Sequence, residues 1–358
     1  MNLDERARRA ADLLRREIDE PWAAPARTGD PFDRFERSRA RRARNQRIAT
    51  VVVASALAAL TLVFVARALG PDRSTTPASL PGGRILYGEW NWRRQEAHWF
   101  VASPDGSARR DLGVVATCAE WFPDGDLIFV TSDADPQPGA PLRPAVIRAD
   151  GSGLSILDGT RSPDLNLGCG DVSPDGTRIV LEGFARADPA SSGIYSVRSS
   201  DGGGLLRLTH GPDSYPQFAP DGQQVAFMRT KHGLLPDGAG ALFVVDADGG
   251  DARRITQWGA AFIDQAWSPD GRWIVFQRPY GRLFIVHPDG SDPHEVPVDL
   301  PAGSGAQEPS WSPDGTWIVF SLSHDDQADL YVVRPDGTGL TRLTDSPGAV
   351  ESGPDWGP

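Results

Sequence analysis

Apolar and polar residues alternate in short runs along most of the chain, and one longer apolar run near its start stands apart. From residue 83 onward, runs such as RWIVF (272–276) and TWIVF (316–320) are separated by turns rich in Pro, Asp and Gly. Short β-branched and aromatic runs bounded by turn residues are typical of β-strands. The pattern therefore predicts an all-β domain over residues 83–358.

The turns recur at a regular interval. Five Pro-Asp-Gly turns have prolines 51, 46, 49 and 44 residues apart, at Pro123, Pro174, Pro220, Pro269 and Pro313. Between them lies a second type of turn containing Asp-Gly, usually followed by a strand such as RLT (207–209). Ser-Pro-Asp-Gly favours a type I turn, because Pro presets φ at its second position. Four antiparallel strands every ~40–50 residues predict the blades of a β-propeller.

The two ends of this domain complement each other. Trp356-Gly357-Pro358 matches Trp311-Ser312-Pro313, but no further turn or strand follows it. Residues 82–87 supply the missing turn and second strand. One blade is therefore expected to be split between the two ends, which predicts a closed ring of six blades.

The longer apolar run predicts a single membrane-spanning helix at residues 48–69. Residues 48–65 carry no charge, and six arginines lie between residues 37 and 47. The length suits a bilayer, and the positive-inside rule places the N-terminus in the cytoplasm. We expect a short basic cytoplasmic segment with an amphipathic helix at 1–47, a linker at 70–82 and an extracytoplasmic propeller anchored in the cell membrane. A cleaved signal peptide is the alternative.

The charge is divided unevenly between these parts. Residues 1–47 carry thirteen Arg and nine acidic side chains, whereas the remainder carries 23 basic and 39 acidic ones. Binding of nucleic acid requires clustered Lys and Arg. The acidic main body therefore argues against a nucleic-acid partner.

The combination W-S-P-D-G, I-x-F and D-G…R-L-T resembles the propeller repeat of TolB, which also occurs in prolyl oligopeptidases and the tricorn protease. This resemblance covers residues 83–358 and implies the fold, but one fold hosts many functions. Separately, the short Arg-rich segment before a single helix resembles actinobacterial membrane partners of sigma factors, without the His and Cys ligands of their zinc-binding domains. A signalling role is therefore an alternative function.

Motifs of catalysis are missing from the sequence. The six histidines do not form HExxH, and no G-x-S-x-G is present. We therefore expect no catalytic residue, metal or cofactor, and a protein that is not an enzyme. The alternative is a lyase or hydrolase with its site at the mouth of the channel.

Two positions of the innermost strand carry polar residues in most repeats. The third residue before the Trp position is Cys118, Cys169, Tyr215, Asp264, Glu308 or Gly353, and the residue directly before it is Glu120, Asp171, Gln217, Ala266, Ser310 or Asp355. We take Glu120, Asp171, Tyr215, Asp264 and Glu308 as candidate binding residues for a cation or cationic ligand. The alternative is polar lining of a water-filled channel.

Cys118 and Cys169 occupy the same position in neighbouring repeats. Oxidation outside the cytoplasm would allow a disulfide between them if their Cα atoms come within about 7 Å. Two buried free thiols are the alternative.

The longer loops are expected on the face opposite the short turns. The first of them carries Trp90, Trp92, Arg93 and Arg94, and Trp and Arg are the types most enriched in interface hot spots. We therefore expect this face to bind an envelope protein or a peptide-like ligand. The alternative is that the tryptophans pack over their own blade.

Overall fold

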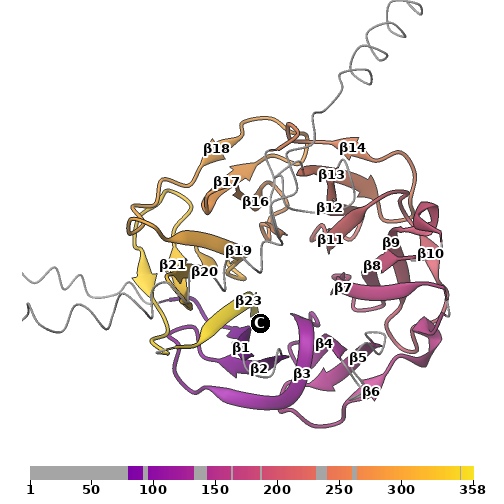
Figure 1. The fold of residues 1–358 in the computed structure, drawn as a ribbon, viewed down its shortest axis with the longest axis horizontal. Coiled ribbons are helices and arrows are strands. Elements are labelled where there is room, and N and C mark those ends of the chain that lie inside the picture. Colours follow the sequence, from indigo (N-terminus) through magenta and orange to yellow (C-terminus); the bar gives the residue numbers. More distant parts are fainter. Residues whose placement is uncertain are drawn as a thin grey trace, which may run out of the picture. The chain divides into compact units, whose positions relative to one another are not determined.

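The computed structural model describes residues 80–91, 96–132, 143–162, 164–185, 188–230, 240–259, 264–346 and 348–358. These residues form an all-β propeller-like fold, with only two short 3-10 helices, η2 (Asp158–Thr160) and η3 (Pro189–Ser191), among them. The sheets follow one another round a ring in chain order (Figure 1). In the described part no helix is both long and apolar enough to cross a membrane. The expected anchor at 48–69 lies outside the described residues.

Three sheets are separate four-stranded units whose strands pair antiparallel in chain order. Their strands are β7 (Asn166–Val172), β8 (Arg178–Phe184), β9 (Gly193–Arg198) and β10 (Leu206–Arg207); β11 (Asp213–Phe218), β12 (Gln224–Thr230), β13 (Gly240–Asp246) and β14 (Arg253–Arg254); and β15 (Gln265–Trp267), β16 (Ile274–Arg278), β17 (Arg282–Val286) and β18 (His294–Glu295).

The other strands form a continuous sheet that contains the two ends of the domain. They are β19 (Gly305–Trp311), β20 (Ile318–His324), β21 (Gln327–Val333), β22 (Thr341–Arg342), β23 (Val350–Gly357), β1 (Arg84–Asn91), β2 (Glu96–Ala102), β3 (Arg110–Trp121), β4 (Leu127–Ser132), β5 (Arg143–Arg148) and β6 (Ser155–Ile156). The strand β3 belongs to two blades, because its first part pairs with β2 and its second part with β4. We call the blade formed by β23, β1, β2 and the first part of β3 the closing blade.

The C-terminal strand lies beside the first strand. Arg84 pairs with Gly357 and Ile85 with Trp356. At the same place a Cβ on Gly83 would lie 2.4 Å from the carbonyl oxygen of Gly357, and Gly83 has φ of 105°, so only glycine fits here. The indole of Trp356 is 4 % exposed, and its Nε1 donates to the carbonyl of Gly82 at 3.3 Å.

The Pro-Asp-Gly turns form the local structure that their residue types favour. In the turn after β15, Oγ of Ser268 donates to Asp270 at 2.6 Å and accepts from the backbone N–H of Trp273 at 2.9 Å. Oδ1 of Asp270 also accepts from the backbone N–H of Arg272 at 3.0 Å. The side chain of Asp270 is thus occupied by its own turn, as expected of an Asx-type turn residue.

The core lies between neighbouring blades, because the second strand of each blade is buried on both faces. Ile274 and Val275 of β16 are fully buried, and the cluster around Val275 includes Trp311 and Phe320 of the next blade. Nε1 of Trp311 crosses this boundary and donates to the carbonyl of Ala266 at 3.1 Å. A continuous apolar run such as WIVF therefore indicates a strand covered on both sides.

Replacing Trp356 by alanine should lower the free energy of unfolding by about 3–5 kcal/mol, because it removes a buried indole from the strand that completes the closing blade. Thermal unfolding of the full chain followed by circular dichroism would measure this loss. Pro358→Ala, at the exposed residue after β23, is the matched control. Equal melting temperatures for the two variants would show that closure does not stabilise the domain.

Candidate functional site

The innermost strands β3, β7, β11 and β19 each contain a β-bulge at or next to the third residue before the Trp position. The register shifts between Ser214 and Gln217 in β11 and between Gln307 and Ser310 in β19, and similar shifts occur in β3 and β7. Tyr215, Asp264 and Glu308 have φ of 53°, 43° and 51°. A left-handed conformation costs a non-glycine residue of order 1–3 kcal/mol. This conformation re-aims the side chain of the bulge residue.

The bulge side chains converge although they come from different blades. The pKa of Tyr215 is raised first by burial and then by the charges of Asp264, Glu182 and Glu308. The pKa of Asp264 lies well above its ordinary value because of burial and the charges of Glu308 and Glu182. We call Glu182, Tyr215, Asp264 and Glu308 the bulge cluster.

The members of the bulge cluster differ in how far their oxygens are occupied. Oε2 of Glu308 accepts the backbone N–H of Gly353 in the closing blade at 2.6 Å. Burial raises the pKa of Glu182 to about 7, although its Oε1 accepts the backbone N–H of Cys169 at 3.3 Å. For Asp264, the described part of the chain shows no hydrogen-bond donor. Asp264 is therefore the carboxyl group with the greatest unused capacity to bind a ligand.

Acidic residues directly before the Trp position accept hydrogen bonds from the neighbouring blade. Oδ2 of Asp171 accepts the backbone N–H of Phe218 in the next blade at 2.7 Å. Oδ2 of Asp355 accepts the N–H of Trp121 at 3.0 Å, again across a blade boundary. These carboxylates join neighbouring inner strands, as polar groups buried at such a boundary must find partners. We call this group, together with Glu120 and Ser310, the belt.

The buried carboxyl groups of the belt lie close enough to affect one another's pKa. Burial raises the pKa of Asp171 to about 7 and that of Asp355 in the same direction. The pKa of Glu120 lies well above its ordinary value because of burial and the charges of Asp355 and Asp171. Ser310 donates to Asp355 at 3.2 Å, which helps to hold that side chain.

The structure divides the candidate residues into two groups. Glu120 and Asp171 belong to the belt, and Tyr215, Asp264 and Glu308 to the bulge cluster. Glu182 was missed because it lies on the second strand of its blade, where the repeat register of the innermost strand gives no signal. Asp355, which occupies the same repeat position as Glu120, was not taken as a candidate binding residue but belongs to the belt.

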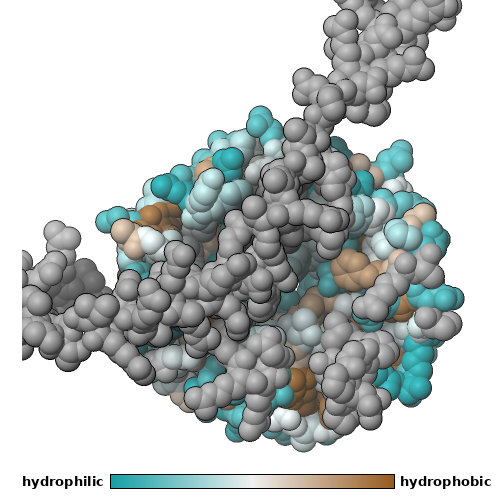
Figure 2. All heavy atoms as spheres, viewed as in Figure 1, coloured by the Kyte–Doolittle hydropathy of each residue, from teal (hydrophilic) through white to brown (hydrophobic). Residues whose placement is uncertain are grey.

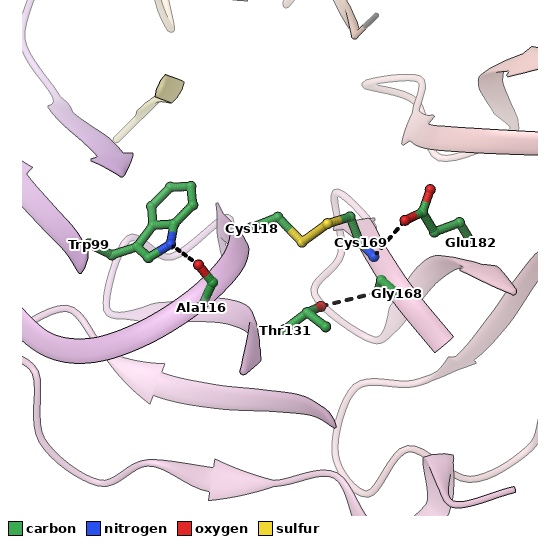
Figure 3. Close-up of a disulfide and its surroundings, with 7 residues drawn as sticks. All are labelled: Trp99, Ala116, Cys118, Thr131, Gly168, Cys169 and Glu182. Carbon is green, nitrogen blue, oxygen red and sulfur yellow. Dashed lines mark hydrogen bonds between the residues drawn. A yellow bond between two sulfur atoms is a disulfide. The ribbon is translucent and has the colours of Figure 1, made fainter. Parts of the chain in front are cut away.

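A disulfide joins Cys118 of β3 to Cys169 of β7, with their Cα atoms 5.8 Å apart. The bond lies across the boundary of two blades, next to Glu182 and to Thr131, whose Oγ1 donates to the carbonyl of Gly168 at 3.0 Å (Figure 3). Bulges in these two blades therefore carry a covalent link where other blades carry acidic or aromatic side chains.

The remaining candidates give less information. Trp90 is half-buried in β1, where it pairs with Ala97. Trp92, Arg93 and Arg94 lie outside the described residues, as do most of the longer loops. In Figure 2, the coloured surface of the described residues is a mixture of polar and apolar residues. Over the described ranges, no group of three or more His, Cys, Asp and Glu side chains is placed to hold a metal ion.

The comparisons with known proteins agree on the fold. The chain is 31% identical over 108 residues to the uncharacterized peptidase YuxL of Bacillus subtilis (strain 168), and 31% identical over 120 residues to tricorn protease homolog 1 of Streptomyces coelicolor (strain ATCC BAA-471 / A3(2) / M145). These matches cover 29% and 30% of this chain but only 16% and 10% of the relatives. The solved structure of TolB from Acinetobacter baumannii matches with a TM-score of 0.60 at 20% identity, over 77% of this chain and 67% of that one.

The expectation that the chain is not an enzyme is contradicted by these relatives, which are named as a peptidase and a protease. It rested on the lack of a catalytic motif. The lack of a motif is a weak argument because the matched segment is a small part of each relative. The catalytic residues of those relatives therefore need not lie in the propeller repeat.

The family model described as the TolB beta propeller domain matches residues 162–358, more than half of the chain. The repeated turns and the inner-strand bulges occur within residues 162–358, and the same features are also found before residue 162. The chain therefore belongs to the TolB beta propeller domain family.

Proposed function

We propose that this chain is a six-bladed propeller that binds a peptide-like ligand through a positively charged group at the bulge cluster. The observation that carries the proposal is the convergence of Asp264, Glu308 and Glu182 on Tyr215. Buried carboxyl groups repel one another when ionised, and a cation among them removes that repulsion. The aromatic ring of a tyrosine also attracts cations.

The bulge cluster suits a ligand better than the belt does. In the belt, Asp171 and Asp355 already accept backbone N–H groups of the next blade. Moving these side chains toward a ligand would leave buried donors without partners, which costs about 1–3 kcal/mol each. Asp264 carries no such obligation within the described residues.

A peptide is the favoured class of ligand because the curated relatives are named as a peptidase and a protease. A peptide offers an amino-terminal ammonium and the side chains of Lys and Arg. Hydrolysis of the bound peptide is the second candidate function, supported by the same two relatives. Recognition at the bulge cluster would serve either function.

The expected topology completes the proposal. Residues 48–65 contain no charge, and the arginine-rich segment before them favours a cytoplasmic N-terminus. The propeller would then lie outside the cytoplasm, where peptides of the cell envelope could reach it. Four-stranded sets in chain order, with β3 shared and β23 completing the closing blade, support a count of six blades.

Asp264→Asn should weaken binding of short cationic peptides at least tenfold, because it removes the carboxylate with no competing hydrogen bond. Isothermal titration calorimetry of the detergent-solubilised full chain, with free and N-acetylated Lys- and Arg-containing peptides, would measure it. Asp251→Asn, at an exposed aspartate, is the matched control. Unchanged affinity in the Asp264 variant would place the site elsewhere, and cleaved peptide in the sample would establish hydrolysis.

The same affinity should rise with pH between about 5 and 8. Burial raises the pKa of Glu182 to about 7, so this carboxyl group gains charge over this range, and burial raises the pKa of Asp264 in the same direction. Stability of the free protein should change in the opposite sense. A raised pKa in the folded state contributes stability that is complete below the unfolded pKa and is lost as the pH rises through the folded pKa. Titrations at several pH values, paired with melting curves, would test both signs, and a pH-independent affinity would contradict the proposed ligand contact.

Alkaline phosphatase fused after Gly82 should be active in a bacterial host, because the fusion point is expected outside the cytoplasm. A fluorescent reporter that matures only in the cytoplasm should stay dark at the same position. Fusions before residue 48 should give the reverse pair of results. A fluorescent reporter after Gly82 together with inactive phosphatase would overturn the orientation.

A further inference from the structure

Glu351 is a fully buried acidic residue in the strand that completes the closing blade. It lies in β23 with an exposed fraction of 0 %, and its cross-strand neighbour in β1 is Glu89. The backbone carbonyl of Glu351 accepts from Oγ of Ser321 in β20. The residue is thus enclosed by the first and last strands of the domain and by the blade before them.

The repeat provides a direct comparison for this residue. Asp213 is five residues before Phe218, as Glu351 is five residues before Trp356, and Asp213 is 1 % exposed. Each acid is preceded by a threonine that bonds to it: Oγ1 of Thr209 donates to Asp213 at 2.5 Å, and that of Thr344 donates to Glu351. The two sites are therefore built on the same plan.

They differ in the residue across the sheet. Opposite Asp213 stands Arg229, whose Nε and Nη2 donate to the two carboxylate oxygens at 2.6 and 2.7 Å. Opposite Glu351 stands Glu89, another acid. The buried aspartate is thus neutralised by an arginine in its blade, whereas the closing blade has an acid at the equivalent position.

The arginines near Glu351 are bound to other acids. Arg109 pairs with Glu89, and Arg342 pairs with Asp329 at 2.7 Å and with Asp345. Tyr87 of β1 also faces this site, and burial raises its pKa to about 12. Among the described residues, neither Oη of Tyr87 nor Oε1 of Glu351 has a hydrogen-bond partner, while Oε2 of Glu351 accepts the N–H of Leu330 at 3.3 Å.

Such surroundings favour the neutral acid. Burial raises the pKa of Glu351, the charge of Asp329 raises it further, and hydrogen bonds from Thr344 and the backbone of Leu330 offset only part of the effect. An ionised carboxylate at this place would be a buried charge without a cation, which is among the most unfavourable arrangements in a protein interior.

We propose that Glu351 acts as a proton-sensitive latch, which holds the C-terminal strand in the ring while it is protonated and releases that strand when it ionises. Below the unfolded pKa its contribution to stability is complete, and it is lost as the pH rises through the folded pKa. The strands β23, β1 and β2 contain no cysteine, so noncovalent contacts alone hold β23 in the closing blade, whereas the boundary between β3 and β7 is held by the disulfide.

Hydrogen exchange measured by mass spectrometry on the full chain between pH 5 and 9 tests the latch locally. After correction for the intrinsic exchange rate, protection of residues 350–357 should fall with rising pH at least tenfold more than protection of β11 and β12. Glu351→Gln should remove this excess fall in β23, because its neutral amide cannot ionise. Asp213→Asn, the matched change in the arginine-paired site, should leave the fall in β23 as it is in the native chain.

A second variant keeps the test valid if Glu351→Gln does not fold. Glu89→Arg combined with Arg109→Glu exchanges the partners of that ion pair and places an arginine opposite Glu351, as Arg229 stands opposite Asp213. The excess fall in β23 over β11 and β12 should then disappear. An undiminished excess fall in either variant, or no excess fall in the native chain, would overturn the proposal. The bulge cluster and Asp355 are present in every variant, so their contribution is the same in all of them and is removed by the comparison.

Discussion

The pairing of β23 with β1 is the constraint on which the rest of the structure depends. In a ring of sheets, each blade covers a face of its neighbour, so every apolar second strand needs a blade on both sides. Without β23, the closing blade would lack its innermost strand and β1 would present an unpaired edge. Trp356 is buried in the cluster that also contains Ile85 and Tyr87 of β1 and Trp317 of the preceding blade. The strand β23 therefore completes the hydrophobic core around β1.

Polar residues of the innermost strands serve two purposes that the backbone separates. At the belt, the strand is regular, and Asp171 and Asp355 reach backbone N–H groups of the following blade. Two residues earlier in the repeat, a bulge interrupts pairing at Tyr215, and both Tyr215 and Asp264 have a left-handed backbone that re-aims their side chains. The belt therefore joins the blades, whereas the bulge position is available for chemistry that varies between repeats, from a disulfide to acidic groups.

Much of the fold could be predicted from sequence because its signals are local. The hydrogen-bonding groups that stabilise the turn at Ser268 all lie within six residues, so these residues alone predict the turn. The repeat register also places Cys118 and Cys169 at equivalent positions of neighbouring blades, and the structure joins them by a disulfide. Register alone does not reveal side chains that arrive from another strand, which is why Glu182 was missed. Nor could it show that Glu351 faces an acid and Asp213 an arginine, because that difference depends on cross-strand partners.

The prediction that the chain is not an enzyme was wrong for a different reason. It rested on the fact that the propeller repeat contains none of the common catalytic motifs. The curated relatives share this repeat over a small part of their length and are nevertheless named as a peptidase and a protease. A turn sequence repeated along the chain, such as Ser-Pro-Asp-Gly, indicates how the blades fold and says nothing about what the ring recognises.

The raised pKa values connect ligand binding with the stability of the ring. A buried carboxyl group is most stable when neutral, so the free propeller favours protonated Asp264 and protonated Glu351 for the same physical reason. The two residues differ in what can neutralise their charge. A cationic ligand could enter among the bulge cluster and offset ionisation there, whereas Glu351 is fully enclosed by protein and can be relieved only by a proton or by movement of β23. The same desolvation therefore underlies both the proposed recognition at the bulge cluster and the proposed opening of the closing blade.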